Sequence, residues 1–270
     1  MSASEGSEFV SIMPTRNLRR MFLCRIRFAL SCALVVVQRR TFVSSECISK
    51  LPPPKGISAI PSGLVGSRVL IVGDGDLGFA NALSCMRVCK TLTASTWDSP
   101  EILESSFLRA SQNVKSIKSN GDNVEYGVDA TKLSYARGTF DTILWNFPHI
   151  AGKQNIRKNR TLLQNFLLSA ATVLNPDGCI KVALCEGQSG TNAENVDDWN
   201  HSWKLVHQAA EAGLLLTQVE PFDSEAFEEF YSPQGHRGRG GRFYTGTSEM
   251  YTLKPAEAKE AAVQAPSYGM

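Results

Sequence analysis

Short apolar runs alternate with amphipathic stretches between Arg68 and Leu253. The runs have the length of buried strands, whereas the apolar residues of the stretches between them recur at helical spacing. This alternation predicts an α/β fold with a mostly parallel sheet and helices on both faces. The predicted strands are 68–72, 91–96, 124–128, 140–145, 178–185, 214–219 and a seventh within 242–253, and the predicted helices include 99–119, 157–174 and 199–212.

The ends of these elements carry turn and capping residues. Asn120-Gly121 is typical of a helix C-cap, and the run from Asn175 to Gly178 is typical of a turn before the fifth strand. The last two strands follow each other without a predicted crossover helix, so we expect a late hairpin. Seven strands with such a hairpin are typical of the methyltransferase variant of the doubly wound sheet.

Residues 1–62 differ from the rest and predict a separate N-terminal extension. Their Arg-rich part surrounds a ten-residue apolar run, 28–37, which is too short for a bilayer span of about 20 residues. The extension fits an organelle presequence, a signal-like segment or an untranslated stretch joined by a wrong start codon. A Pro-rich linker from Leu51 to Gly56 separates it from the predicted domain, 63–254, and a disordered tail is predicted for 255–270.

Charge and cysteine content limit the classes of partner. Residues 1–50 carry a net charge of +5 and the remainder −3, so the predicted domain is not basic overall and RNA affinity must come from local patches. The 7 cysteines are odd in number and lie in apolar stretches, which predicts reduced thiols. No second Cys or His pair complements Cys85 and Cys89, so we expect no metal site.

A glycine-rich turn follows the first predicted strand and opens a helix. Gly73, Gly75 and Gly78 satisfy G-x-G-x-x-G in the context that gives the pattern meaning, and it fits a nicotinamide dinucleotide enzyme as well as a methyltransferase. The intervening Asp74 and Asp76 favour a methyltransferase, because carboxylates repel a pyrophosphate and attract the cationic S-adenosyl-L-methionine. A turn that only packs helix on strand remains a third interpretation.

Two further acids follow successive predicted strands. Asp98 follows the second strand and is placed to accept both hydroxyls of a ribose, and Asp129 follows the third and is placed to contact an adenine amino group. Both lie at the expected carboxyl edge of the sheet, where open α/β folds bind ligands. Each also fits a helix N-cap or an Asx-turn.

The fourth predicted strand ends in Asn146, Phe147, Pro148 and His149. An amide at this position can accept from and donate to a target nitrogen and its neighbours, and the aromatic rings can stack a base. Removal of an imide proton needs a base, for which His149 is available. Candidate phosphate contacts surround this loop: Lys153, Arg157, Lys158 and Arg160, and in a glycine-rich segment Arg237, Arg239 and Arg242.

These residues together resemble a known family. The stretches VLIVGDGDLGFANAL, TASTWDS, YGVDATKL, FDTILWNFPHIAG and IRKNRTLLQNFLLSA are similar, in this order, to the 25S rRNA (uridine-N3) methyltransferases. The resemblance implies a Rossmann-like class I methyltransferase fold, S-adenosyl-L-methionine as cofactor, a large-subunit rRNA partner, no metal, and a nucleolar, nuclear or cytoplasmic location. It places the donor loop at Gly73 to Asp76, the ribose acid at Asp98 and the catalytic loop at Asn146 to His149.

The resemblance has departures. Asp74 stands where the family commonly has Glu, and Leu77-Gly78 where it commonly has Phe-Ser. CEGQSGT and HRGRGGRF resemble a branch whose members also carry a ferredoxin-fold anticodon-binding domain. Two other functions therefore stay open, a noncatalytic RNA-binding or ribosome-assembly factor and an NAD(P)-dependent oxidoreductase. We expect a monomer without stable membrane insertion.

Overall fold

The computed structural model describes residues 60–150, 155–233, 245 and 247–256. The chain divides into two units, Met1–Pro54 and Lys55–Met270, and every described residue belongs to the second. The predicted targeting segment lies outside the described residues, as does the predicted tail from residue 257 onward.

The described part is built on one seven-stranded sheet with the order β3-β2-β1-β4-β5-β7-β6. All neighbouring pairs are parallel except those that β7 makes with β5 and β6. This confirms the predicted Rossmann-like methyltransferase fold with its late hairpin. The strands are β1 (Arg68–Ile71), β2 (Thr91–Ser95), β3 (Asn123–Glu125), β4 (Phe140–Asn146), β5 (Leu174–Cys185), β6 (Leu214–Pro221) and β7 (Ser248–Pro255).

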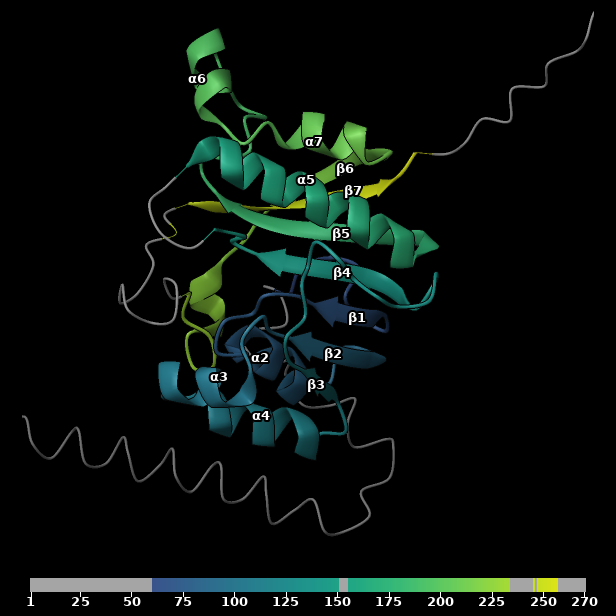
Figure 1. Ribbon diagram of the computed structural model, residues 1–270, viewed down its shortest axis with the longest axis vertical. Coiled ribbons are helices and arrows are strands. Elements are labelled where there is room, and N and C mark those ends of the chain that lie inside the picture. The colour runs from purple at the N-terminus through teal and green to yellow at the C-terminus, as the bar shows by residue number, and fades with distance from the viewer. Residues whose placement is uncertain (1–59, 151–154, 234–244, 246, 257–270) are drawn as a thin grey trace, which may run out of the picture. The chain divides into compact units, whose positions relative to one another are not determined.

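Helices lie on both faces of this sheet (Figure 1). Each face buries its own apolar core, because side chains alternate along each strand. Leu70 and Val72 face a core with α5 (Ile156–Val173) and α7 (Leu205–Glu211). Val69 and Ile71 face a core with α2 (Gly78–Met86), α3 (Pro100–Ser106) and α4 (Ala110–Ser119). Two short helices, α6 (Val196–His201) and η3 (Ser224–Phe227), complete the described elements.

The single helix predicted over 99–119 is wrong. The backbone of Phe107 is extended, with φ −133° and ψ 120°, and it ends α3. The Phe107 side chain is buried in the core on the α2 face. Burial of this ring therefore outweighs continuous helical hydrogen bonding, and α4 starts anew at Ala110.

The single helix predicted over 199–212 is also wrong. It is broken between α6 and α7 at Lys204, whose φ is 55°. Trp203 is buried beside α7, whereas Trp199 is only half-buried and Lys204 Nζ lies 5.3 Å from its ring centroid. His207 is exposed, so of these three side chains only Trp203 is buried in the core.

Two strand ends differ from the prediction. β3 stops at Glu125 because the chain turns at Gly127, where φ is 67°. β5 begins early, at Leu174, and the predicted turn from Asn175 to Gly178 lies within it at a shift of register against β4. A Cβ on Gly178 would lie 2.7 Å from the Asp141 carbonyl oxygen, so the close approach of β4 requires glycine here.

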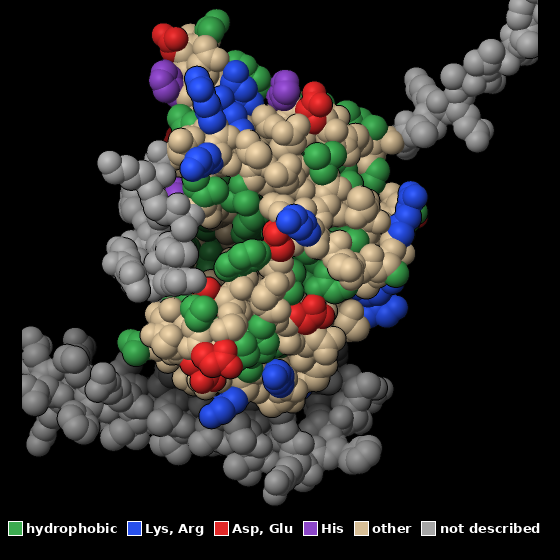
Figure 2. All heavy atoms as spheres, viewed as in Figure 1, with side chains coloured by type: hydrophobic (Ala, Val, Ile, Leu, Met, Phe, Trp, Pro, Cys, Tyr) green, Lys and Arg blue, Asp and Glu red, His purple; other side chains and the backbone are tan. Residues whose placement is uncertain are grey.

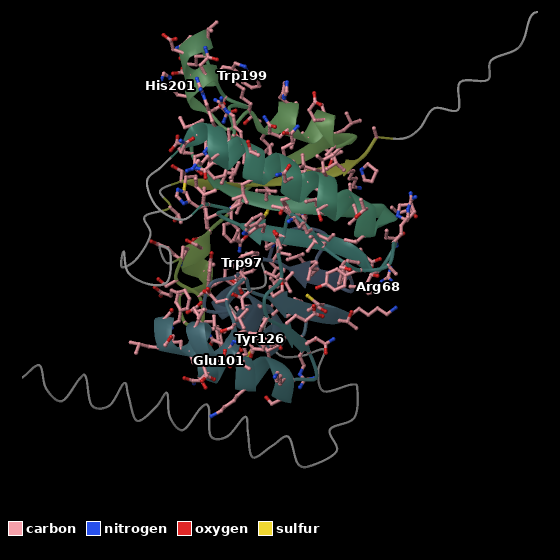
Figure 3. All side chains as sticks on the ribbon, in the orientation of Figure 1. Arg68, Trp97, Glu101, Tyr126, Trp199 and His201 are labelled. Carbon is pink, nitrogen blue, oxygen red and sulfur yellow. The ribbon has the colours of Figure 1, made fainter. Side chains whose placement is uncertain are left out.

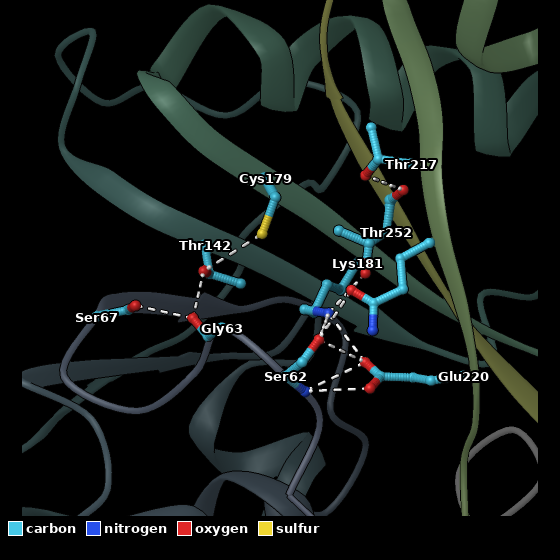
Figure 4. Close-up of polar contacts among 10 residues, drawn as sticks. Ser62, Gly63, Ser67, Thr142, Cys179, Lys181, Thr217, Glu220 and Thr252 are labelled. Atoms are coloured by element: carbon cyan, nitrogen blue, oxygen red, sulfur yellow. Dashed lines mark hydrogen bonds and ion pairs between the residues drawn. The ribbon is translucent and has the colours of Figure 1, made fainter.

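A buried ion pair fastens the start of the described part to the late hairpin (Figure 4). The Lys181 side chain is 1% exposed, and its Nζ donates to Thr252 Oγ1 at 2.6 Å and lies 3.1 Å from Glu220 Oε1. Ser62 donates through its backbone N–H and hydroxyl to Glu220. The segment before β1 is thus held against β5, β6 and β7.

A second ion pair lies at the amino edge of the sheet, where the parallel strands begin. Arg68 donates from its backbone N–H and its guanidinium to Asp141, and Asn175 Nδ2 donates to the same carboxylate. The hydrogen bond from the Arg68 side chain is the main cause that holds the pKa of Asp141 well below its usual value. Asp141 therefore binds the beginnings of β1, β4 and β5 together.

The described residues also bear on the thiols, on metal ligands and on membrane spans. Cys85, Cys89, Cys179 and Cys185, the cysteines among the described residues, form no disulfide. Burial raises the pKa of the Cys89 thiol to about 12. No cluster of potential metal ligands occurs in the described ranges, and none of the helices described there is long and apolar enough to cross a bilayer.

Candidate donor and methyl-transfer site

The candidate site lies where the strand order reverses. β1 and β4 are neighbours in the sheet but not in the sequence, and the crossovers from them run to opposite faces. Open α/β sheets bind ligands at this point, outside the carboxyl ends of the strands. The turn Gly73–Gly78 after β1, here named the donor turn, and the end of β4 at Trp145 and Asn146 meet there.

The three glycines of the turn serve different purposes. Added Cβ atoms would lie 2.5 Å from Trp145 Nε1 at Gly73 and 2.7 Å from the Phe230 carbonyl oxygen at Gly78, so packing inside the protein requires these two glycines. At Gly75, where φ is 37°, the nearest atom is Phe107 Cζ at 4.0 Å. Gly75 therefore leaves space that a ligand can occupy.

Both acids of the turn are buried, and each also caps the helix that follows. Asp74 Oδ2 accepts the Ala80 N–H at 2.7 Å, and Asp76 Oδ1 accepts the Gly78 N–H at 3.0 Å. These bonds satisfy amides that the first turn of α2 leaves without helical partners. Asp74 and Asp76 therefore have a structural role as helix caps. That both acids also bind the donor stays a prediction.

The electrostatics of the turn suit a cation. Burial raises the pKa of Asp74 well above its usual value, although its bond to Ala80 opposes this, and the charge of Asp76 raises it further. Burial likewise raises the pKa of Asp76, which the hydrogen bond from Gly78 and the charge of Arg109 partly offset. A positively charged ligand beside these groups would stabilise their ionised forms. The turn therefore fits a sulfonium or ammonium group.

The loops that carry Asp98 and Asp129 lie next to each other. The Gly127 N–H donates to the Asp98 carbonyl at 3.4 Å, and the Val128 N–H donates to the Thr96 carbonyl at 3.0 Å, so the loops after β2 and β3 run side by side. Asp129 Oδ1 accepts from the N–H and hydroxyl of Thr131 at 2.9 and 2.7 Å, which is an Asx-turn. The turn orients Asp129 at the carboxyl edge, and its adenine contact remains a prediction.

Asn146 is the most unusual polar group of the site. The residue is 9% exposed, yet neither its Nδ2 nor its Oδ1 forms a hydrogen bond with any residue that the structure describes. Buried amides nearly always have partners, and an unsatisfied one costs about 1–3 kcal/mol. The orphaned amide at the end of β4 is therefore a candidate ligand-binding group.

The residues after Asn146 form a strained and anchored loop. Phe147 has φ 50°, a conformation that bulky residues rarely adopt. The centroid of its ring lies 5.8 Å from that of Phe222. Pro148 is buried and His149 is exposed. The Ile150 N–H donates to Asn159 Oδ1 of α5 at 3.2 Å, which holds the loop in place.

The predicted RNA-contacting residues have different surroundings. Arg157 and Lys158 are exposed on the first turn of α5, and Figure 2 shows Lys and Arg side chains gathered near this turn and α6. The Arg160 guanidinium donates instead to the carbonyls of Asn200 and Ser202, so it braces the end of α6. The remaining candidates, Lys153, Arg237, Arg239 and Arg242, lie outside the described residues.

The segment Phe222–Tyr231, here named the strap, reaches the donor turn from the loop between β6 and β7. The Phe79 ring of α2 contacts three strap rings, Phe222, Phe227 and Tyr231, with centroids 5.1 to 5.7 Å away. Arg109 Nη1 donates to the Glu229 carbonyl at 3.2 Å. This cover was not predicted from the sequence, although Phe227, Phe230 and Tyr231 recur at the i, i+3, i+4 spacing of a helix face and so are a signal that the sequence contains.

Two further candidate residues were not predicted from the sequence. Asn113 Nδ2 donates to the Asp76 carbonyl at 2.9 Å and thereby supports the donor turn from α4. Trp97 is 62% exposed beside Asp98, and Figure 3 shows it far from Arg68 at the amino edge. An exposed tryptophan directly after a predicted strand is a signal that the sequence does contain.

Comparisons with known proteins show which proteins this chain is similar to. The model of a family described as rRNA (uridine-N3-)-methyltransferase BTM5-like matches residues 70–234. The ferredoxin-fold anticodon-binding domain-containing protein 1 of Homo sapiens is 38% identical over 183 residues, and its homolog in Mus musculus is 37% identical over the same length. These matches cover 66% of this chain but only 29% of each relative.

Among solved structures, the 16S rRNA methyltransferase KamB has 18% identity and a TM-score of 0.46, over 71% of this chain and 90% of that one. The family match, in contrast, spans more than half of this chain and includes the donor turn, the end of β4 and the strap. The chain therefore belongs to the family of rRNA (uridine-N3-)-methyltransferase BTM5-like proteins.

Proposed function

We propose that this chain is an S-adenosyl-L-methionine-dependent methyltransferase that modifies N3 of a uridine in large-subunit rRNA. One observation carries the proposal. At the point where the strand order reverses, the tight turn with Asp74 and Asp76 lies beside the side-chain amide of Asn146, which has no hydrogen-bond partner among the described residues. Membership of the rRNA methyltransferase family supports the choice of RNA and of the uridine nitrogen.

The residues around the donor turn fit this cofactor, which supplies a methyl group on a sulfonium cation. Asp74 and Asp76 favour positive charge, and the space beside Gly75 admits a ligand close to the backbone. Asp98 and Asp129, on adjoining loops, are proposed to accept the ribose hydroxyls and to contact the adenine amino group. A pyrophosphate would instead meet two buried carboxylates, which disfavours a dinucleotide.

The acceptor half of the reaction requires position and proton removal. Nitrogen must be held in line with the breaking carbon–sulfur bond, so rigid placement contributes more than any other effect. Asn146, fixed at the end of β4, is proposed to hold the target base. The exposed His149, three residues further on, is proposed to accept the imide proton. Arg157 and Lys158 are proposed to contact phosphates beside this loop.

Mass spectrometry of rRNA nucleosides tests the proposal. We expect cells that lack the protein to lose one N3-methyluridine of the large subunit, and the wild-type gene to restore it. Asp129→Ala and Asn146→Ala should fail to restore it while the proteins accumulate to normal levels. An unchanged N3-methyluridine content in the deletion strain contradicts the proposed substrate.

Thermal unfolding separates the proposed cofactor from the alternative one. A ligand that binds only the folded state raises the unfolding midpoint. We expect S-adenosyl-L-methionine or S-adenosylhomocysteine to raise it and NADH to leave it unchanged. The reverse result contradicts the proposed chemistry and favours an oxidoreductase.

A further inference from the structure

A buried pair of side-chain amides connects α2 and α4 to the donor turn. Asn113 of α4 is 4% exposed, and its Nδ2 donates to the Asp76 carbonyl oxygen at 2.9 Å. Its Oδ1 accepts from Asn81 Nδ2 of α2 at 3.0 Å, and Asn81 is 6% exposed. Asn113 therefore binds the donor turn with one side-chain atom and the neighbouring helix with the other.

The Asp76 carbonyl depends on this bond because the hydrogen bonds of α2 do not reach it. In a regular helix the Ala80 N–H would donate to the carbonyl of Asp76, four residues earlier. Here the Ala80 N–H donates to Asp74 Oδ2 at 2.7 Å instead. Asn113 thus supplies the partner that this carbonyl would otherwise lack among the described residues.

The bond also fixes the peptide group between Asp76 and Leu77, where the turn is strained. Leu77 has φ 63° and ψ 24°, a left-handed conformation that residues with a side chain rarely adopt. The C=O and N–H of one trans peptide point in opposite directions. When Asn113 holds the carbonyl, the Leu77 N–H is therefore directed back to the Asp74 carbonyl oxygen, 2.5 Å away. Both ends of this peptide are bonded, so the turn keeps its shape beside the space at Gly75.

Stability alone does not explain why these two residues are polar. Replacing both partners of a buried hydrogen bond by apolar groups of the same shape is often nearly neutral or stabilising. Leucine has the same branching as asparagine. Leu83 of α2 and Ile117 of α4, one turn after Asn113, already lie in the apolar core on this face of the sheet. The amides are therefore explained by the turn that they hold.

We propose that Asn113 is a positioning residue for donor binding, which holds the donor turn through the Asp76 carbonyl in the conformation that receives S-adenosyl-L-methionine. This inference rests on the proposed function through its cofactor, and it adds a residue of α4 to the parts that determine donor affinity. The side chain bonds to the donor turn and to α2, not to β4. Its loss should therefore weaken donor binding and leave the acceptor half of the reaction unchanged.

Calorimetry with S-adenosylhomocysteine and urea unfolding test the proposal on three variants. Asn113→Leu removes both bonds, and its matched control, Asn81→Leu, removes only the bond between the amides. We expect both to be less stable than wild type, since each leaves a buried polar atom unpaired, but only Asn113→Leu to bind S-adenosylhomocysteine about tenfold more weakly. The double variant should regain part of the stability, because two leucines pack together, and still bind about tenfold more weakly.

Steady-state kinetics give a readout that a purely structural role would not move in this way. We expect Asn113→Leu to raise the KM for S-adenosyl-L-methionine about tenfold and to keep a kcat on rRNA within twofold of wild type. If Asn113→Leu does not fold, Asn113→Ser takes its place, because its shorter side chain cannot reach the Asp76 carbonyl. A lower kcat with an unchanged KM overturns the proposal.

The outcomes separate this inference from the proposed function. Wild-type affinity for S-adenosylhomocysteine in Asn113→Leu overturns the positioning role and leaves the proposed function standing. Equal weakening in Asn81→Leu and Asn113→Leu also overturns it, since donor affinity would then follow stability. If wild type binds S-adenosylhomocysteine but makes no N3-methyluridine, only the proposed substrate fails, and calorimetry still decides the role of Asn113. If wild type binds no S-adenosylhomocysteine, the proposed cofactor and this inference fail together.

Discussion

At the scale of single residues, Asp74 combines two requirements that conflict. Its carboxylate caps α2 through Ala80, yet burial penalises its charge. Asparagine keeps an oxygen for the Ala80 N–H and carries no charge. The structure therefore separates a role in stability, which an amide can fill, from a role in attracting a cation, which it cannot.

We predict that Asp74→Asn stabilises the protein and weakens its affinity for S-adenosyl-L-methionine. A raised folded-state pKa means that the folded protein holds the proton more tightly, so the contribution of Asp74 to stability falls as pH rises through that value. The gain of the variant in free energy of unfolding should grow above about pH 4, where an unfolded Asp ionises, and then level off. Urea unfolding over a pH series and calorimetry measure the two effects.

Asp177→Asn, at an exposed aspartate within β5, serves as the control. It should change neither the free energy of unfolding nor the affinity for S-adenosyl-L-methionine. If Asp74→Asn binds the donor as tightly as wild type, the carboxylate is only a helix cap.

We predict that Gly75→Ala impairs donor binding much more than it impairs folding. A side chain at φ 37° costs about 1–2 kcal/mol, and the new Cβ enters space that only a ligand would need. Gly66→Ala is the matched control, since Gly66 has φ 73° and no atom within 4 Å of the added Cβ. Both variants should lose similar stability, and only Gly75→Ala should lose affinity in calorimetry. Equal affinities would show that the donor does not pass beside Gly75.

The sequence could predict which of these residues gather, because residues that end parallel strands meet at one edge of the sheet. It could not predict how they are bonded. The capping bonds of Asp74 and Asp76 and the Asx-turn of Asp129 depend on backbone angles that local sequence leaves open. The orphaned amide of Asn146 depends on burial by residues far away in the chain.

At the scale of elements, the contact between Lys181 and Glu220 holds the late hairpin to the segment before β1. We predict that Lys181→Met lowers the free energy of unfolding by about 3 kcal/mol, because Glu220 and Ser62 lose a buried partner. The variant with Lys181→Met and Glu220→Leu should recover much of this loss. Urea denaturation gives both values.

A single variant as stable as wild type would mean that water replaces the ammonium group at no cost. A double variant less stable than the single one would mean that Glu220 is held chiefly by Ser62, whose N–H and hydroxyl both reach it.

Prediction from sequence succeeded best for the elements with strong local patterns. β1, β2, β4 and α5 lie within one or two residues of their predicted bounds, because long apolar runs and helical spacing dominate there. Prediction failed where a single residue serves a distant partner. Phe107 breaks a helix to reach the core, and Lys204 adopts φ 55° between two short helices.

At the scale of the whole molecule, a net negative domain must bind RNA through local charge. We predict that a variant with Arg157→Glu and Lys158→Glu binds rRNA fragments more weakly and with a smaller salt dependence. Each lost phosphate contact should reduce the slope of log affinity against log salt by about 0.7 for single-stranded RNA. Fluorescence anisotropy over a salt series measures this slope.

The control places the same charge change on α4, at the exposed Lys115 and Lys118. Because α4 covers the other face of the sheet from α5, this variant should keep the wild-type slope. An equal reduction of this slope in both variants would mean that RNA affinity depends only on the net charge of the protein.

The strap also sets an order of events during synthesis. Gly78 and Tyr231 are 153 positions apart, yet they touch. After the donor turn has been synthesised, the ribosome must therefore add 153 further residues, more than half of the chain, before the aromatic cover is complete. Until then the donor turn lacks its aromatic cover, so we expect S-adenosyl-L-methionine to give little protection to a chain that ends before the strap.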